Sequence, residues 1–129
     1  MTGPLQMLLA RTPPPPAPTL SVSAAVYGGS VPVNVSTASG TSDALPGGGF
    51  RYFDANASGG SPPYRYSWSR QNGVNKTVLI DPDSERARVQ WSDMVVGEYQ
   101  STTARCEVTD ANGATATSST IVIGFNRVA

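Results

Sequence analysis

Histidine is absent from the 129-residue sequence, and Cys106 is its only cysteine. A chain without histidine lacks the usual general base and the commonest metal ligand, so it cannot build a Ser-His-Asp or Cys-His nucleophile. A single cysteine excludes an internal disulfide, on which small secreted domains often depend. The composition therefore argues against the commonest hydrolases and favours folding in a reducing compartment.

Charge is also scarce, because nine basic and nine acidic residues leave a formal net charge of zero. Binding to nucleic acid through its phosphates, or to an anionic membrane surface, requires a basic excess. No apolar run approaches the roughly 18 residues of a transmembrane helix, and the short run at 4–10 lacks the positive start of a signal peptide. We therefore expect neither a nucleic-acid partner nor a membrane partner.

The first part of the chain differs from the rest. Only Arg11 and Asp43 are charged in residues 1–50, which are rich in Pro, Gly, Ser and Thr. Residues 13–18, PPPPAP, are typical of a stiff polyproline II spacer, with an SH3-type ligand as the alternative. We interpret residues 1–18 as an anchoring arm with a proline-rich spacer, although a disordered terminus is the simpler alternative. The arm would contact another subunit through Leu5, Met7, Leu8 and Leu9.

Residues 19–129 are predicted to form one β-sandwich domain. Apolar and polar residues alternate with the period of a half-buried strand in residues 19–25, 50–58, 64–70, 86–91 and 103–110. A proline, Pro32, makes 31–37 an edge strand, while 76–80 and 115–125 add a short strand and a returning strand. The pattern indicates seven or eight short strands and no helix.

The segments between the strands carry turn signals. Gly59-Gly60 and Pro62-Pro63 form a turn that cannot continue a ladder, and residues 38–49 and 92–99 are expected to be loops. Residues 110–113, DANG, predict a hairpin, because Asn-Gly accepts positive φ at both central turn positions.

Three of these stretches carry a family likeness. Residues 59–69, GGSPPYRYSWS, the Gly97–Tyr99 corner and the Thr109–Gly113 hairpin resemble PKD and SprB-type repeats of bacterial surface proteins. They also resemble the immunoglobulin-like domains of tailed-bacteriophage virion proteins. The likeness covers residues 50–124 in a single copy, and the stretch from Tyr99 to Asp110 is longer than in the short repeats.

The resemblance implies an immunoglobulin-like β-sandwich of seven or eight antiparallel strands. It implies a non-enzymatic virion structural protein, tail-associated or a capsid decoration, that uses no cofactor and is assembled in the bacterial host cytoplasm. The arm would hold it to other virion proteins in many symmetric copies, and the domain would attach weakly to a host-surface glycan. The alternative is a bacterial cell-surface adhesion module or a carbohydrate-binding module.

The core is expected to form around the aromatic strand. Alternation places Tyr64, Tyr66 and Trp68 on one face, where Trp68 fills the centre of the sandwich unless the strand is a carbohydrate-stacking platform. Val108 points inward with Cys106, which lies where the resemblance implies one half of an inter-sheet disulfide. The position expected opposite it is near Ala55, so Cys106 is interpreted as a small buried apolar residue.

The carboxylates do not form a recognisable catalytic or metal-binding motif. Asp81, Asp83 and Glu85 offer oxygen ligands to calcium, but a solvated loop is the simpler interpretation. The remaining acidic residues that a glycosidase would need as a pair have no such context, namely Asp54, Asp93, Glu98, Glu107 and Asp110. We therefore expect no catalytic residue and no metal site.

Overall fold

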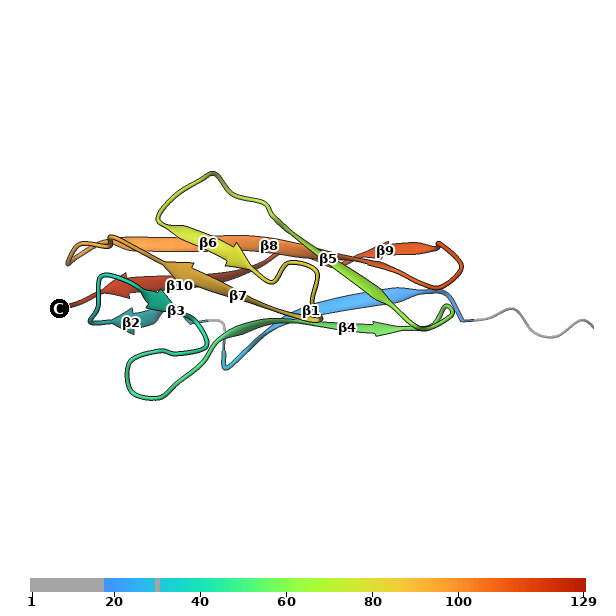
Figure 1. The fold of residues 1–129 in the computed structure, drawn as a ribbon, viewed down its shortest axis with the longest axis horizontal. Helices are drawn as coiled ribbons and strands as arrows, with labels where there is room; N and C mark the ends of the chain where they lie inside the picture. Colours follow the sequence, from blue (N-terminus) through green and yellow to red (C-terminus); the bar gives the residue numbers. More distant parts are fainter. Residues whose placement is uncertain (1–17, 30) are drawn as a thin grey trace, which may run out of the picture.

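The computed structural model describes residues 18–29 and 31–129, and within them the chain is an all-β protein of two five-stranded sheets (Figure 1). The strands are β1 (Ser21–Tyr27), β2 (Val33–Val35), β3 (Gly40–Thr41), β4 (Tyr52–Ser58), β5 (Arg65–Arg70), β6 (Thr77–Ile80), β7 (Arg86–Trp91), β8 (Tyr99–Thr109), β9 (Thr115–Thr117) and β10 (Ile121–Arg127). The expected anchoring residues Leu5, Met7, Leu8 and Leu9 lie outside the described residues. No helix in the described part of the chain has the length and hydropathy needed to cross a bilayer.

The first sheet has the strand order β1-β4-β7-β3, with β6 on the other side of β7. The second sheet has the order β2-β10-β8-β5, with β9 also paired to β8. The prediction that all strands are antiparallel is wrong at one place, because β2 pairs parallel to β10. The partner of β2 is β10, which lies far away in the sequence. No hairpin therefore joins these two strands, and they are not forced to run antiparallel. As expected from Pro32, β2 lies at an edge.

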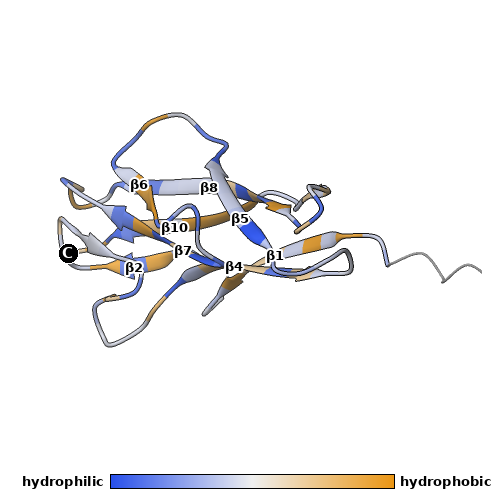
Figure 2. Cartoon of the chain, turned by 45° about the vertical axis from the view of Figure 1, so that its right-hand side comes forward, coloured by the Kyte–Doolittle hydropathy of each residue, from blue (hydrophilic) through white to orange (hydrophobic). Residues whose placement is uncertain are grey.

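Strict alternation of side chains builds the core between the sheets. Ala87, Val89 and Trp91 of β7 are fully buried, and on β8 the side chains of Ala104, Cys106 and Val108 are fully buried as well. Figure 2 shows apolar and polar residues interleaved along the strands, as a two-sided sheet requires. The sequence prediction of a β-sandwich with these inward residues is confirmed.

Two aromatic pairs join the sheets. Phe53 of β4 stacks on Trp68 of β5, with ring centroids 5.5 Å apart. Trp91 of β7 packs on Phe125 of β10 at 4.7 Å. Because aromatic side chains bury the largest apolar areas, these two contacts are the main anchors between the layers.

The turn after β8 is a hairpin, but the predicted reason is wrong. Five residues, 110–114, separate the last pair Thr109–Thr115, and only Gly113 among them has positive φ. The side chain of Asp110 organises the turn, because its Oδ1 accepts the N–H groups of Asn112 and Ala114 at 2.9 Å each. The hydrogen bonds of the Asp110 side chain therefore hold this five-residue turn, so it does not need the positive φ at both central positions that the predicted two-residue loop required.

Three other strand boundaries differ from the prediction, one because of a side-chain hydrogen bond and two because of strand pairing. The returning strand is split into β9 and β10, because the Ser118 hydroxyl accepts the Cys106 N–H in place of a ladder carbonyl. The expected loop at 38–49 contains the short strand β3, and β8 starts earlier than predicted, at Tyr99. Both shifts follow from pairing with β7 and β10, which local patterning does not reveal.

Candidate functional site

The predicted core residues lie together in the interior. Trp68 is 3% exposed and opposes Cys106 in the β5–β8 ladder, while Val108 is fully buried and Tyr66 is half-buried beside it. The Trp68 indole Nε1 donates to the Ser84 carbonyl at 2.9 Å. These residues therefore contribute to packing between the sheets.

Burial also suppresses the chemistry of the one thiol. Desolvation raises the pKa of Cys106 to about 11. A thiol with such a pKa is almost entirely protonated at neutral pH, and only the thiolate is an effective nucleophile. Cys106 thus behaves as a small apolar residue, and Ala55, which is also buried, cannot bridge to it.

The candidate calcium ligands are used differently. Asp81 pairs with Arg88, whose guanidinium also contacts Asp43 at 2.8 Å. The Thr41 hydroxyl, helped by Arg88, holds the pKa of Asp43 below its usual value. Across residues 18–29 and 31–129, no three acidic or cysteine side chains converge on a point where a metal could bind. The described surface also contains no pocket.

The most distinctive surface feature is a cluster of three aromatic side chains, the exposed Tyr27 and Phe50 and the half-buried Tyr52, together with Arg86 and Asp54. We call these five residues the aromatic patch. Tyr27 and Phe50 are 45% and 40% exposed. Large exposed aromatic groups of this kind often mark binding surfaces, because solvent contact costs free energy unless a partner covers them.

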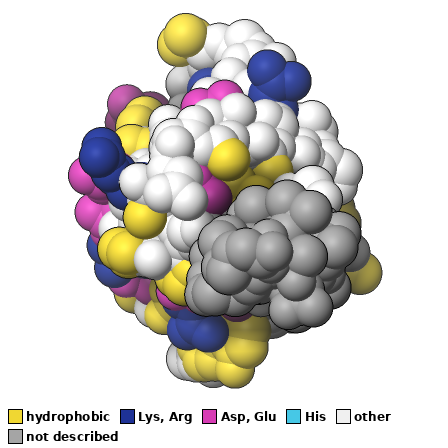
Figure 3. All heavy atoms as spheres, turned by 90° about the vertical axis from the view of Figure 1, so that its right-hand side faces the viewer, with side chains coloured by type: hydrophobic (Ala, Val, Ile, Leu, Met, Phe, Trp, Pro, Cys, Tyr) yellow, Lys and Arg dark blue, Asp and Glu magenta, His cyan; other side chains and the backbone are white. Residues whose placement is uncertain are grey.

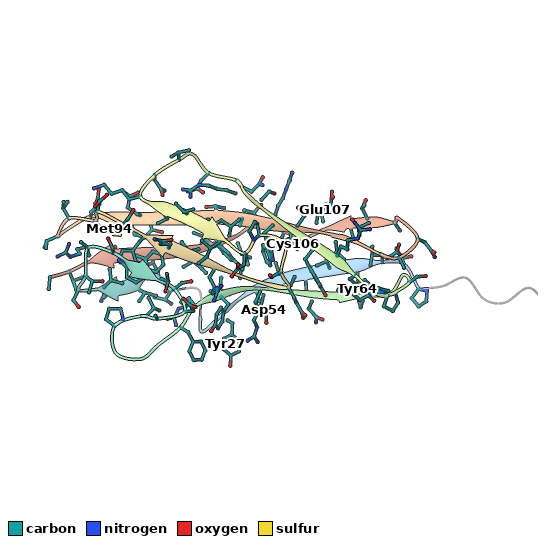
Figure 4. The ribbon with its side chains drawn as sticks, in the orientation of Figure 1. Tyr27, Asp54, Tyr64, Met94, Cys106 and Glu107 are labelled. Atoms are coloured by element: carbon teal, nitrogen blue, oxygen red, sulfur yellow. The ribbon has the colours of Figure 1, made fainter. Side chains whose placement is uncertain are left out.

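The sheet register assembles this patch. Tyr27 of β1 is directly opposite Tyr52 of β4, and Asp54 of β4 is opposite Arg86 of β7. Since side chains alternate along a strand and Phe53 points inward, its neighbours Tyr52 and Asp54 point outward. Figure 4 shows Tyr27 and Asp54 on the lower side of the sandwich, whereas Glu107 projects from the upper side.

The patch is tightly packed within itself. The ring centroids of Tyr27 and Phe50 are 5.3 Å apart and nearly parallel, and Tyr52 tilts against both. The Arg86 guanidinium lies 4.9 Å from the Tyr27 ring centroid and 5.3 Å from that of Tyr52. Arg86 also pairs with Asp54 at 3.1 Å, so the patch carries no net charge. The patch therefore combines partly exposed rings with one guanidinium and one carboxylate.

Outside the aromatic patch, the charged side chains of the described residues are of both signs. At the end of the molecule seen in Figure 3, basic and acidic side chains are interspersed among polar and apolar groups. Lys76 pairs with Glu98 at 2.8 Å, and this hydrogen bond is the main reason that the pKa of Glu98 is lowered. The part of this end that is described shows no basic stripe of the kind on which phosphate binding depends.

Sequence reasoning missed the aromatic patch. The strand predicted at 19–25 stops short of Tyr27, and Phe50 lies outside the strand that carries Tyr52. A usable signal was the position of Tyr52 and Asp54 on the polar side of an alternating strand. The contact with Tyr27 could not be found in this way, because it depends on which strands are neighbours.

No protein-family model, curated protein or solved structure matches the chain.

Proposed function

We propose that the sandwich is an immunoglobulin-like display domain of a bacteriophage virion, either tail-associated or a capsid decoration. The strand order supports the immunoglobulin-like part of this proposal, and the virion role rests on the resemblance of residues 50–124. Immunoglobulin-type sandwiches place strands A, B, E and D in one sheet and C, F and G in the other. The orders β1-β4-β7-β6 and β5-β8-β10 follow the same scheme, in agreement with the fold that the resemblance implies.

The proposed role is structural and non-enzymatic. The thiol is buried and protonated at neutral pH. Several carboxylates are held in ion pairs with arginine or lysine, among them Asp43, Asp54 and Glu98. A carboxylate paired in this way makes a poor general base, because the neighbouring cation stabilises its ionised form.

In this proposal residues 1–18 hold the protein to other virion subunits through the apolar side chains of the arm. A protein lacking residues 1–12 should then fail to co-sediment with purified particles, while its β domain keeps the circular dichroism of the full chain. The matched control replaces two exposed valines of the domain, Val31→Ser with Val128→Ser, and should be incorporated normally. Normal incorporation of the truncated protein would show that the arm is not the anchor.

A second candidate function, glycan binding, is favoured by the aromatic patch. Aromatic rings pack against the C–H faces of sugars, and guanidinium and carboxylate groups bind vicinal hydroxyls. Because Asp54 neutralises Arg86, a neutral host-surface glycan fits this surface better than a strongly charged one. The binding would be weak, because the described surface has no pocket to enclose a sugar.

Replacing Phe50 by alanine should lower the affinity for host-envelope polysaccharide about tenfold, which corresponds to about 1.4 kcal/mol. Isothermal titration calorimetry with purified polysaccharide measures this change. The control is Tyr99→Ala, since Tyr99 is 49% exposed on the opposite sheet, away from the patch. Equal losses in the two variants, or none in Phe50→Ala, would rule out the patch as the glycan site.

A further inference from the structure

The first sheet ends in a long edge strand. Among residues 18–29 and 31–129, β1 pairs only with β4, and no strand covers its other edge. The remaining edge strands are shorter or protected: β2 has three residues and follows Pro32, β3 has two, β6 has four and β9 three. On β5, the edge N–H of Trp68 is bonded to the Pro82 carbonyl. Unprotected edges pair readily with another strand, so β1 is the edge at which pairing is expected.

The register shows which groups of β1 are free. Ala55 donates its N–H to the Glu85 carbonyl, hence toward β7 and away from β1. Its opposite residue Ala24 is therefore a non-hydrogen-bonded position of the β1–β4 ladder. By alternation, the N–H and C=O groups of Val22, Ala24 and Val26 point to the free edge. The contact from Gly29 N–H to the Val26 carbonyl at 3.3 Å agrees with this orientation, and a carbonyl can accept a second bond.

The same three side chains face the core but remain only half-buried. The side chains of the neighbouring inner strands, such as Phe53 and Ala87, are fully buried. The difference arises because the edge of the sheet leaves one flank of Val22, Ala24 and Val26 open. A further strand in the same plane would cover that flank as well as satisfy the free backbone groups.

We propose that β1 pairs antiparallel with β1 of a second copy of this chain, around a twofold axis at Ala24. This register places Val22 opposite Val26 of the second copy and Ala24 opposite itself. All three are edge-facing positions, so each pair exchanges two hydrogen bonds, about six in total. The register also keeps inward residues opposite inward ones, which makes the apolar layer continuous. No residue of β1 is charged, so no like charges oppose one another across the axis.

The pairing is tested first on the full chain by sedimentation equilibrium and by amide hydrogen exchange. We expect the mass to approach that of two chains as the concentration rises to about 1 mM, the range suited to a weak association. The amides of Val22, Ala24 and Val26 should exchange more slowly over the same range. A monomer at every concentration would overturn the proposal.

Two variants and one control variant locate the interface. Ala24→Pro removes an edge donor that makes no bond to β4, so the dimer should be lost while the domain stays folded. In the proposed register Ser23 opposes Ala25 of the second copy, on the outer face. Ser23→Lys with Ala25→Lys therefore places like charges across the axis and should abolish the dimer, whereas Ser23→Glu with Ala25→Lys should retain it. The variant with Ser23→Glu is the control for the double lysine variant, because both carry Ala25→Lys, which places the same lysine opposite Asp54 of β4.

Thermal unfolding of each variant checks that the domain remains folded. A dimer that survives both Ala24→Pro and the double lysine change would show that the interface lies elsewhere, which contradicts the proposal. Pairing of β1 with a strand from a different protein, instead of with a second copy of this chain, would contradict it as well. Particle incorporation is measured separately. Incorporation of a monomeric Ala24→Pro protein would therefore remain compatible with the proposed virion role.

Discussion

Replacing Trp68 by alanine is expected to lower the free energy of unfolding by about 3–5 kcal/mol, the usual cost of truncating a buried tryptophan. The Trp68 ring stacks on Phe53 across the sheet gap at 5.5 Å, and its exposed fraction is 3%. Its removal leaves a cavity between the sheets and deprives the Ser84 carbonyl of its indole donor. Since domains of this size have stabilities of about 5–15 kcal/mol, much of the margin would be lost.

Denaturant unfolding followed by far-ultraviolet circular dichroism measures this loss. Arg65→Ala is the control, because Arg65 lies on the same strand and is exposed on the outer face. Its stability should stay within about 0.5 kcal/mol of the parent. A Trp68→Ala protein with unchanged stability would show that this strand is a binding platform rather than the centre of the core.

Gly40→Ala should have the second largest effect, a loss of about 1–3 kcal/mol from overpacking. A Cβ at Gly40 would lie 2.5 Å and 2.6 Å from two ring carbons of Trp91. Trp91 cannot yield, because it is fully buried, packs on Phe125, and donates from Nε1 to the Thr37 carbonyl at 3.3 Å. The same unfolding measurement reports the change.

Gly124→Ala is the matched control for this prediction. A Cβ at Gly124 would lie 2.5 Å from the Tyr99 hydroxyl, so the clash is equally close. Tyr99 is half exposed, however, and its ring can turn into solvent. The clash is then relieved, and the reduced freedom of the unfolded chain compensates by about 0.4–1 kcal/mol. Equal losses at the two glycines would contradict the distinction between a fixed and a movable ring.

The aromatic patch and the β1 edge lie on the same sheet but present different chemistry. The patch projects from the outer face through Tyr27 and Tyr52, whereas the edge presents backbone groups in the plane of the sheet. In the proposed dimer Tyr27 would oppose Ser21 of the second copy at the end of the paired strands. Two patches would then face the same side of one continuous sheet. Weak binding of a repeating glycan would gain from such a pair, because a second contact on the same ligand is intramolecular.

Local patterning was sufficient to predict the strands that alternate most strictly. The inward residues of β7 and β8 follow from the period of two, which is a property of the extended backbone itself. The burial of Trp68 beside Cys106 follows in the same way once two sheets are assumed. The all-β class and the edge position of β2 also needed only composition, periodicity and Pro32.

Only the tertiary structure decided which strands are neighbours, because register and sheet order depend on contacts between residues far apart in the chain. The parallel β2–β10 pair and the split between β9 and β10 belong to this group. So does the polar network in which Arg70 donates to the main-chain oxygens of Thr77 and Ser101. The aromatic patch joins Tyr27 of β1, Tyr52 and Asp54 of β4, Phe50 two residues before β4, and Arg86 at the start of β7. The free groups of β1 exist because no described strand follows it in the sheet, a fact of packing that its own seven residues do not encode.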